Sequence, residues 1–277
     1  MPELPEVETM CRGIRQVKGR RISRVSTPKC SLRPIRIAPS VSAIQKCLRD
    51  EAILDITRLG KRVLLHTEEY ALILQPRMAG LVSLGVAPSS KHIRLQIDFH
   101  GEPDCRLLYW DRRGLGSVEL IRNDEVQSRI VVGRLGPDAL QITSEDFATR
   151  LAKTSRAIKV ALLDQKLLAG VGNLYASEML HVAGIHPATP AAQLSKSRIR
   201  RLYNAMQDVL LTAIEHEGST LSDGTYRNAL NDPGSYQNQH RVYDRAGAPC
   251  PKCSAGIVER IVQAQRSTFF CSRCQKT

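Results

Sequence analysis

The sequence has no long apolar run and few aromatic side chains. No stretch approaches the roughly 18 to 20 uncharged residues that a membrane-spanning helix needs. The opening segment MPELPEVETM carries glutamates where a signal peptide would carry lysines and an apolar core. We therefore expect a cytoplasmic protein with no membrane partner. Aromatic residues make up only 4% of the chain, which offers few stacking platforms for RNA bases and argues against an RNA-binding protein.

Acidic residues are too few to balance the basic ones. The 277 residues include 40 lysines and arginines against 27 aspartates and glutamates, so the formal net charge is +13. Such a surplus favours a polyanionic partner, and nucleic acid is the leading candidate. Hydrophobic residues, at 42%, are sufficient for packed cores, and the length exceeds what one core usually serves, so we expect more than one domain.

Cysteines are too sparse for a disulfide scaffold, and they fall into two groups. Four lie singly in apolar or basic surroundings and receive no chemical role: Cys11, Cys30, Cys47 and Cys105. The others form two CxxC pairs near the end of the chain: Cys250, Cys253, Cys271 and Cys274. This spacing predicts one structural Zn²⁺ in a zinc ribbon, because four thiolates complete a tetrahedron and leave no position for a catalytic water. The alternatives are disulfide pairing of the same cysteines and a coincidental spacing.

Hydrophobic periodicity predicts an α+β protein. Apolar residues at spacings of three and four over 3–17 predict an opening amphipathic helix. Short apolar runs with a period of two follow and predict an antiparallel β-sandwich or barrel; they are 63–65, 71–74, 92–99, 107–110 and 118–121.

A helical region follows the strands. We expect helices that begin at the capping residue Thr143, span 158–168, run from an N-cap at Asn173 to Gly184, and span 199–213. Residues 219–239 are rich in Gly, Asn, Asp and Ser and predict a long mobile loop. The predicted domains are a β-sandwich domain, a helical domain and a basic zinc finger, over 1–135, 136–240 and 241–277.

The amino terminus offers a nucleophile. Pro2 follows an initiator methionine, and removal of that methionine exposes a secondary amine that can attack an electrophilic carbon and form an iminium. Glu3 and Glu6 lie close enough in sequence to transfer the proton. Two alternatives stay open: these glutamates, with Glu8, only complement a helix dipole, or Met1 is retained and the Pro2 nitrogen is an amide.

Several segments together resemble the bacterial formamidopyrimidine-DNA glycosylase family. They are the opening MPELPEVET, the segment LDQKLLAGVGNLYASE at 163–178, AGIHP at 183–187, and the terminal four-cysteine finger. They occur in order over nearly the whole chain, and the PELPEVET form favours this branch over the related endonuclease VIII enzymes. The resemblance implies an N-terminal helix with a β-sandwich domain, then a helical domain with a helix-two-turn-helix and a C-terminal zinc finger. It also implies a cytoplasmic, nucleoid-associated monomer.

The resemblance implies catalytic roles by position. Pro2 is implied to attack C1′ of the damaged nucleotide, Glu3 to help open the sugar and carry protons, and Glu6 to support the site. Lys61 matches a phosphate-contacting lysine in front of a strand, although on the residues alone it is interpreted as a solvated lysine.

The resemblance also implies DNA contacts. Asn173 matches an asparagine that holds a phosphate near the lesion, and Arg266 matches a zinc-finger arginine beside the flipped nucleotide. Met78 matches a methionine that fills the gap in the duplex. Where the family reads Asp-Pro-Arg-Arg-Phe-Gly, residues 111–116 read Asp-Arg-Arg-Gly-Leu-Gly, so Arg113 takes the arginine position and Leu115 replaces the aromatic wedge. Because of this departure, the sequence does not determine which base is preferred opposite the lesion. A similar departure over 219–237 leaves the preferred lesion undetermined.

The function implied is a bifunctional DNA glycosylase and AP lyase of base excision repair. It would act on double-stranded DNA that contains oxidised bases or abasic sites. It would remove 8-oxoguanine and formamidopyrimidines through a Schiff base on Pro2, followed by β,δ-elimination, with one structural Zn²⁺. The alternatives are an endonuclease VIII-like glycosylase for oxidised pyrimidines and a non-catalytic protein that binds damaged DNA.

Overall fold

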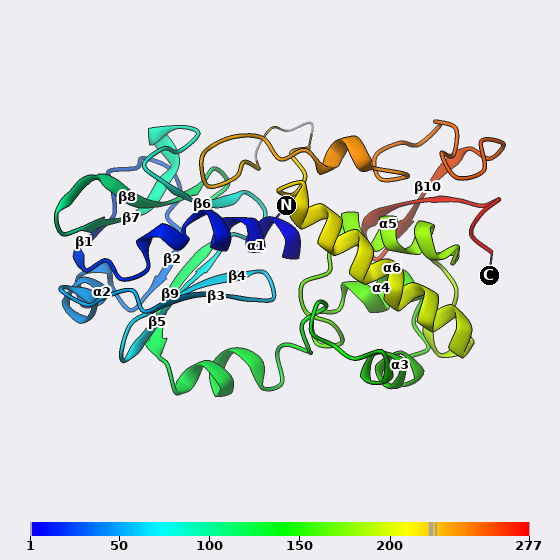
Figure 1. Cartoon of the computed structure of the whole chain (residues 1–277), viewed down its shortest axis with the longest axis horizontal. Helices are drawn as coiled ribbons and strands as arrows, with labels where there is room; N and C mark the ends of the chain where they lie inside the picture. The colour runs from blue at the N-terminus through cyan, green and yellow to red at the C-terminus, as the bar shows by residue number, and fades with distance from the viewer. Residues whose placement is uncertain (1, 222–223, 225, 277) are drawn as a thin grey trace. The chain divides into compact units, whose positions relative to one another are not determined.

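The computed structural model describes residues 2–221, 224 and 226–276. The chain forms two compact units, Met1–Val132 with His216–Gln237, and Gly133–Glu215 with Asn238–Thr277 (Figure 1). Its mixed helices and strands confirm the predicted α+β class. The domain boundaries stay a prediction. By its contacts, the segment 216–237 belongs with the first unit and not with the helices that precede it. Among the described residues, no helix has the length and apolar character needed to cross a bilayer.

The described residues of the first unit contain two β-sheets, two α-helices, short 3-10 turns and a π-helix at Gln127–Val131. Its elements are α1 (Leu4–Gly13), β1 (Ile22–Ser26), β2 (Arg36–Ala38), α2 (Val41–Leu48), β3 (Asp55–Leu59), β4 (Arg62–His66), β5 (Tyr70–Gln75), β6 (Gly80–Leu84), β7 (Ile93–Phe99), β8 (Glu102–Asp111) and β9 (Ser117–Arg122). The sheet orders are β1-β7-β8-β6 and β2-β9-β5-β4-β3. The predicted apolar runs lie in β4, β5, β7, β8 and β9. The β2–β9 pair is parallel, which the antiparallel prediction did not include.

Helix α1 lies between the two sheets and contributes to the core of the first unit (Figure 1). It packs against β3 and β4 of one sheet and β6 of the other. Val7, Met10 and Ile14 are fully buried, and each such burial stabilises the fold by about 1.5 to 3 kcal/mol. The α-helix ends at Gly13, earlier than predicted, and a 3-10 turn over Arg15–Val17 continues the buried stripe.

Residues 216–237 return to the first unit after the helices of the second. Tyr226 and Ala229 join its core, and the backbone N–H of Leu84 donates to the carbonyl of Ala229 at 3.2 Å. Over the described residues of the predicted 219–239 loop, the regular element is a 3-10 turn at Tyr236–Gln239. The mobility of this loop stays a prediction.

The second unit, over its described residues, contains four α-helices, a 3-10 turn at Ala191–Gln193 and a hairpin. Its elements are α3 (Ser144–Ala152), α4 (Ile158–Leu163), α5 (Asn173–Ala183), α6 (Lys196–Glu215), β10 (Val258–Gln263) and β11 (Arg266–Cys271). Thr143 caps α3 as predicted, because its Oγ1 accepts the Asp146 N–H at 3.2 Å. The end predicted for α4 at residue 168 is wrong. The helix stops at Leu163, and Asp164 then accepts the Lys166 N–H and forms a local turn.

Two turns position the functional residues of the second unit. Gly172, and not the predicted Asn173, is the N-cap of α5, so Asn173 is the first helical residue. The β10–β11 hairpin closes with a two-residue turn in which Ala264 and Gln265 have φ of 47° and 60°. Positive φ at both positions is typical of a type I′ turn, whose twist matches that of the strands. Arg266 directly follows this turn.

Candidate functional site

The buried start of α1 carries the predicted catalytic residues. Pro2 is buried, and Glu3 and Glu6 are 3% and 2% exposed. The Glu6 carboxylate joins two backbone segments: Oε2 accepts the Glu3 N–H at 2.8 Å, and Oε1 accepts the Ser219 N–H at 2.9 Å. Glu6 also lies in the first turn of α1, where the helix dipole favours a negative charge. The arrangement brings the first residues of the chain and residue 219 to one place.

Gly218, which precedes Ser219, packs closely against Glu6. Gly218 has a φ of +80°, and a Cβ at this position would lie 2.9 Å from Cγ of Glu6. Burial and the nearby charge of Glu6 raise the pKa of Tyr226 well above its usual value, so its hydroxyl stays protonated. This hydroxyl donates to the Glu217 carbonyl at 2.9 Å. Glycine at 218 is therefore required both by backbone conformation and by space.

Met78 lies beside the loop that carries Arg113 and Leu115. The register pairs Gln75 with Ser117 in one sheet and Gly80 with Asp111 in the other. The same two pairs therefore bracket both loops, 76–79 and 112–116, and hold them next to each other. Met78 and Leu115 are each 37% exposed. The structure thus brings together three residues that the resemblance assigned to filling a duplex gap.

Asp111 organises this second loop from inside the fold. It is fully buried, and its two carboxylate oxygens accept the backbone N–H groups of Arg113 at 3.0 Å and Gly116 at 2.7 Å. The Arg94 guanidinium donates through Nε to the Asp111 carbonyl at 2.9 Å. Gly114 has a φ of +62°, and a Cβ there would lie 2.9 Å from the carbonyl oxygen of Arg33.

Asp111 and Arg94 are positioning residues that were not predicted from the sequence. A signal for Asp111 was available, since a carboxylate at a strand end before a glycine-containing turn commonly accepts backbone N–H groups. No sequence pattern pointed to Arg94, because the loop residues that it contacts lie far from it in the sequence.

Lys61 lies in the tight turn between β3 and β4 and is half-buried. The strand before it is fixed to α1 by an ion pair between Arg58 Nε and Glu8 Oε2 at 3.0 Å. Partial burial opposes ionisation of Glu8, but hydrogen bonds from Arg12 and Arg58 outweigh it and lower the Glu8 pKa. Glu8 therefore stays charged and supports the turn that presents Lys61.

In the second unit, Asn173 lies against the finger hairpin. Its Nδ2 donates to the Ser267 carbonyl at 2.9 Å, and its Oδ1 accepts from Lys159 Nζ at 3.0 Å. Arg266 is exposed and adjacent in sequence to Ser267, so the structure brings the two predicted phosphate-binding residues together. Sequence reasoning missed Lys159, which is fully buried and also donates to Ser177 Oγ at 3.1 Å. A lysine inside the apolar run of α4 was the available signal.

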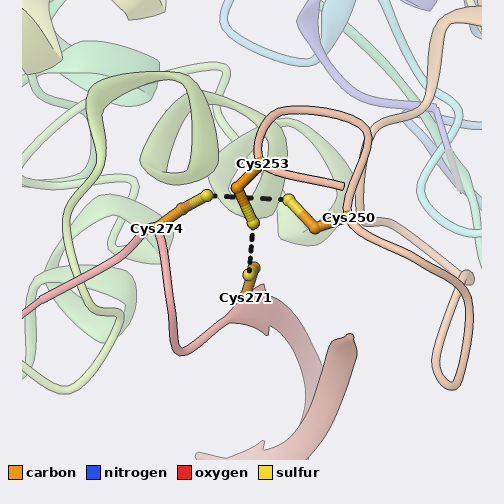
Figure 2. Close-up of side chains that lie close together, drawn as sticks. All are labelled: Cys250, Cys253, Cys271 and Cys274. Carbon is orange, nitrogen blue, oxygen red and sulfur yellow. Dashed lines mark hydrogen bonds between the residues drawn. The ribbon is translucent and has the colours of Figure 1, made fainter. Parts of the chain in front are cut away.

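The four predicted zinc ligands converge from two CxxC turns (Figure 2). Their sulfur atoms all lie within 4.8 Å of one another, with Cys250–Cys274 at 3.7 Å and Cys253–Cys271 at 4.0 Å. Ligands on a tetrahedral Zn²⁺ with bonds of 2.3 Å are about 3.8 Å apart, so these thiols fit the ion. The site is structural, since four thiolates leave no open coordination position.

Helix α5 anchors the chain that leads into the finger. Glu178 is fully buried and accepts backbone N–H groups from Arg241, Val242 and Tyr243 at 2.9, 3.0 and 2.8 Å. Burial raises the Glu178 pKa, while these three donors favour its charged form. Because each donor requires an acceptor, the carboxylate fixes the backbone of residues 241–243 on α5.

Three sequence profiles match the chain. The profile described as "Formamidopyrimidine-DNA glycosylase N-terminal domain" matches residues 1–118, and "Formamidopyrimidine-DNA glycosylase H2TH domain" matches residues 135–225. "Zinc finger found in FPG and IleRS" matches residues 247–277 and includes all four cysteines. The profiles follow one another along the chain in the order expected from the resemblance.

Curated relatives and solved structures are similar to the chain over its whole length. The formamidopyrimidine-DNA glycosylase of Chloroflexus aurantiacus is 38% identical, covering 100% of this chain and 98% of the relative. That of Bacillus subtilis is 39% identical, with 99% of each covered. A Lactococcus lactis Fpg variant in complex with Fapy-dG DNA has a TM-score of 0.89 at 33% identity, covering 100% of both chains. The Lactococcus lactis Fpg bound to DNA with an abasic site has a TM-score of 0.88 at 32% identity, covering 99% of this chain and 100% of that one.

Proposed function

This chain belongs to the formamidopyrimidine-DNA glycosylase family, and on that premise we propose that it removes oxidised purines, 8-oxoguanine and formamidopyrimidines, from double-stranded DNA and then cleaves the strand. As a member of this family it is a DNA glycosylase of base excision repair. The observation that carries the finer proposal is the buried group of Pro2, Glu3 and Glu6 at the start of α1. We further propose that it acts as a monomer at the nucleoid.

In the proposed reaction, Pro2 is the nucleophile once Met1 has been removed. Its secondary amine attacks C1′, Glu3 transfers a proton that opens the sugar ring, and the base departs, which leaves an iminium between Pro2 and the sugar. Loss of a C2′ proton then expels the 3′ phosphate, and a second elimination expels the 5′ phosphate. Hydrolysis of the remaining iminium frees the amine. Glu6 is a positioning residue in this account, because it fixes the Glu3 backbone.

The remaining residues are proposed to hold distorted DNA. Lys61, Asn173 and Arg266 supply polar or cationic groups for phosphates, and Asn173 stands at the N-terminus of α5, where backbone N–H groups favour anions. Met78, Arg113 and Leu115 would occupy the space of the extruded nucleotide. Extrusion costs a few kcal/mol, and apolar wedges between base steps are a known means of offsetting it. Bound zinc supplies no chemistry here; the cysteine ligands and the metal fix the hairpin that carries Arg266.

Cleavage of a panel of duplexes tests the proposal. With 8-oxoguanine, formamidopyrimidine and thymine glycol substrates, we expect release of the oxidised purines and phosphate at both ends of a one-nucleotide gap. Preferential release of thymine glycol would favour the endonuclease VIII-like alternative. Binding without any base release would favour the non-catalytic alternative. DNA affinity is also expected to fall as a power of salt concentration, because the phosphate contacts release counterions.

A further inference from the structure

His181 lies at the last turn of α5 and contacts a zinc ligand. The imidazole Nε2 is 3.3 Å from the sulfur of Cys250, and both residues are fully buried. His181 belongs to the helical part of the second unit and Cys250 to the first CxxC turn. The contact therefore joins two segments that are 69 residues apart in sequence.

The chemistry of the pair determines which atom donates. A thiolate that binds zinc has no proton and can only accept, so the imidazole must donate through Nε2–H. The other ring nitrogen, Nδ1, has no hydrogen-bond partner among the residues that the structure describes. A neutral imidazole with its single proton on Nε2 can therefore donate to the sulfur. In this tautomer Nδ1 carries no proton, so no buried N–H is left without an acceptor.

The position of Cys250 explains why its thiolate needs a hydrogen-bond donor. Four thiolates on one Zn²⁺ carry net negative charge, and the C-terminal end of a helix carries partial negative charge of its own. A fully buried sulfur in that position is unfavourable unless donors surround it. Lys252, in the same CxxC turn, donates from Nζ to the Val182 carbonyl at 3.1 Å. The first CxxC turn thus rests on the last turn of α5, where His181 meets its buried ligand.

We propose that His181 is an outer-sphere positioning residue of the zinc site, whose Nε2–H donates to the Cys250 thiolate and retains it on the metal. Outer-sphere partners of this kind typically change metal affinity by about 10- to 100-fold when removed. The inference concerns metal retention and does not depend on the lesion or the mechanism proposed above.

Replacement of the ring tests the donor directly in the full-length, zinc-loaded protein. His181→Phe keeps an aromatic ring but removes the N–H, whereas His181→Gln can place an amide N–H near the same position. His186→Phe is the matched control, because His186 packs edge-on against Phe270 at 4.7 Å between ring centroids in the same unit. In equilibrium zinc transfer to a chromogenic chelator, the affinity of His181→Phe for zinc should be about 10- to 100-fold weaker. It should be near the parent value in His181→Gln and His186→Phe.

Cobalt substitution separates this role from general packing. In the Co²⁺-loaded protein, loss of an N–H donor to sulfur should shift the sulfur-to-cobalt charge-transfer band in His181→Phe but not in the other two variants. If His181→Phe fails to fold, His181→Met compared with His181→Gln provides the same contrast. Unchanged band positions and unchanged zinc transfer in the apolar variants would overturn the proposal. So would a parent spectrum that shows imidazole in place of one thiolate.

Discussion

The backbone N–H of Ser219 donates to Glu6 Oε1 at 2.9 Å and so connects residues 213 positions apart in the sequence. The other oxygen of the same carboxylate accepts the N–H of Glu3 at 2.8 Å. One buried side chain therefore fixes both the start of α1 and the beginning of the 219–237 segment, which the resemblance assigns to lesion recognition.

Replacing Glu6 by Gln should disturb both attachments. An amide retains a single acceptor oxygen, so one of the two backbone N–H groups faces an NH₂ and is left unsatisfied at a cost of about 1 to 3 kcal/mol. We expect a lower thermal midpoint and slower base release on 8-oxoguanine duplexes. Asp124→Asn, which changes an exposed carboxylate, is the control and should alter neither value. Parent-like stability and base release in Glu6→Gln would contradict the positioning role.

Replacing Asp111 by Asn should loosen the loop that carries Arg113 and Leu115. The buried carboxylate accepts two backbone N–H groups, and the amide leaves one of them unsatisfied, at about 1 to 3 kcal/mol. We expect weaker discrimination between opposite bases, measured as the ratio of cleavage rates for 8-oxoguanine paired with cytosine or adenine. Asp98→Asn in β7 serves as the control, since its carboxylate meets side chains outside the loop, Gln96 Nε2 at 2.7 Å and Arg106 Nε at 3.7 Å. An unchanged ratio in Asp111→Asn would show that the loop keeps its shape without the carboxylate.

Removal of zinc should release the hairpin from Asn173. Coordination free energy in such sites is about 10 to 16 kcal/mol in small peptides and becomes folding free energy. We expect a chelator, or Cys253→Ser, to abolish hydrogen-exchange protection in β10 and β11 and to weaken DNA binding, while the strands of the first unit keep their protection. Cys105→Ser should behave like the parent. Retained protection in β11 after complete metal loss would disprove the structural role of the ion.

The stability of the protein should fall in mild acid because of His240. Burial, and then the charge of Arg245, lower the His240 pKa to about 4, against about 6.5 in an unfolded chain. Between these values the unfolded chain binds more protons, so acid favours unfolding. From about pH 7.5 to 5.5 this single group should lower the free energy of unfolding by roughly 1 kcal/mol. His240→Phe should remove that part of the pH dependence of the unfolding free energy in urea titrations. Equal pH dependence in the parent and His240→Phe would refute the role of His240.

Local patterns predicted the elements that depend on neighbouring residues. The apolar stripe of α1, the cap at Thr143, the stop at Gly184 and the CxxC pairs are all defined within a few positions of the chain, and the structure contains each of them. The end of α4 was missed because Asp164 makes a side-chain hydrogen bond that competes with the helix.

Long-range contacts explain what the sequence could not predict. Glu6 meets Ser219, Lys159 meets Asn173 and His181 meets Cys250 only after the chain has folded. None of these pairs has a spacing signal. The resemblance named some of their members, but the supporting residues Lys159 and His181 became evident only in the fold. The parallel β2–β9 pair was likewise hidden, because β2 is a short strand with mixed exposure.

The atom to which the DNA becomes attached tests the role of Pro2 most directly. The protein should first be shown by mass spectrometry to begin at Pro2, then reacted with abasic-site DNA in the presence of borohydride, digested and sequenced by tandem mass spectrometry. We predict a reduced deoxyribose adduct on the nitrogen of Pro2 and no adduct in Pro2→Gly preparations that retain Met1. An adduct on a lysine side chain, or full strand cleavage by protein whose Pro2 nitrogen remains an amide, would contradict it.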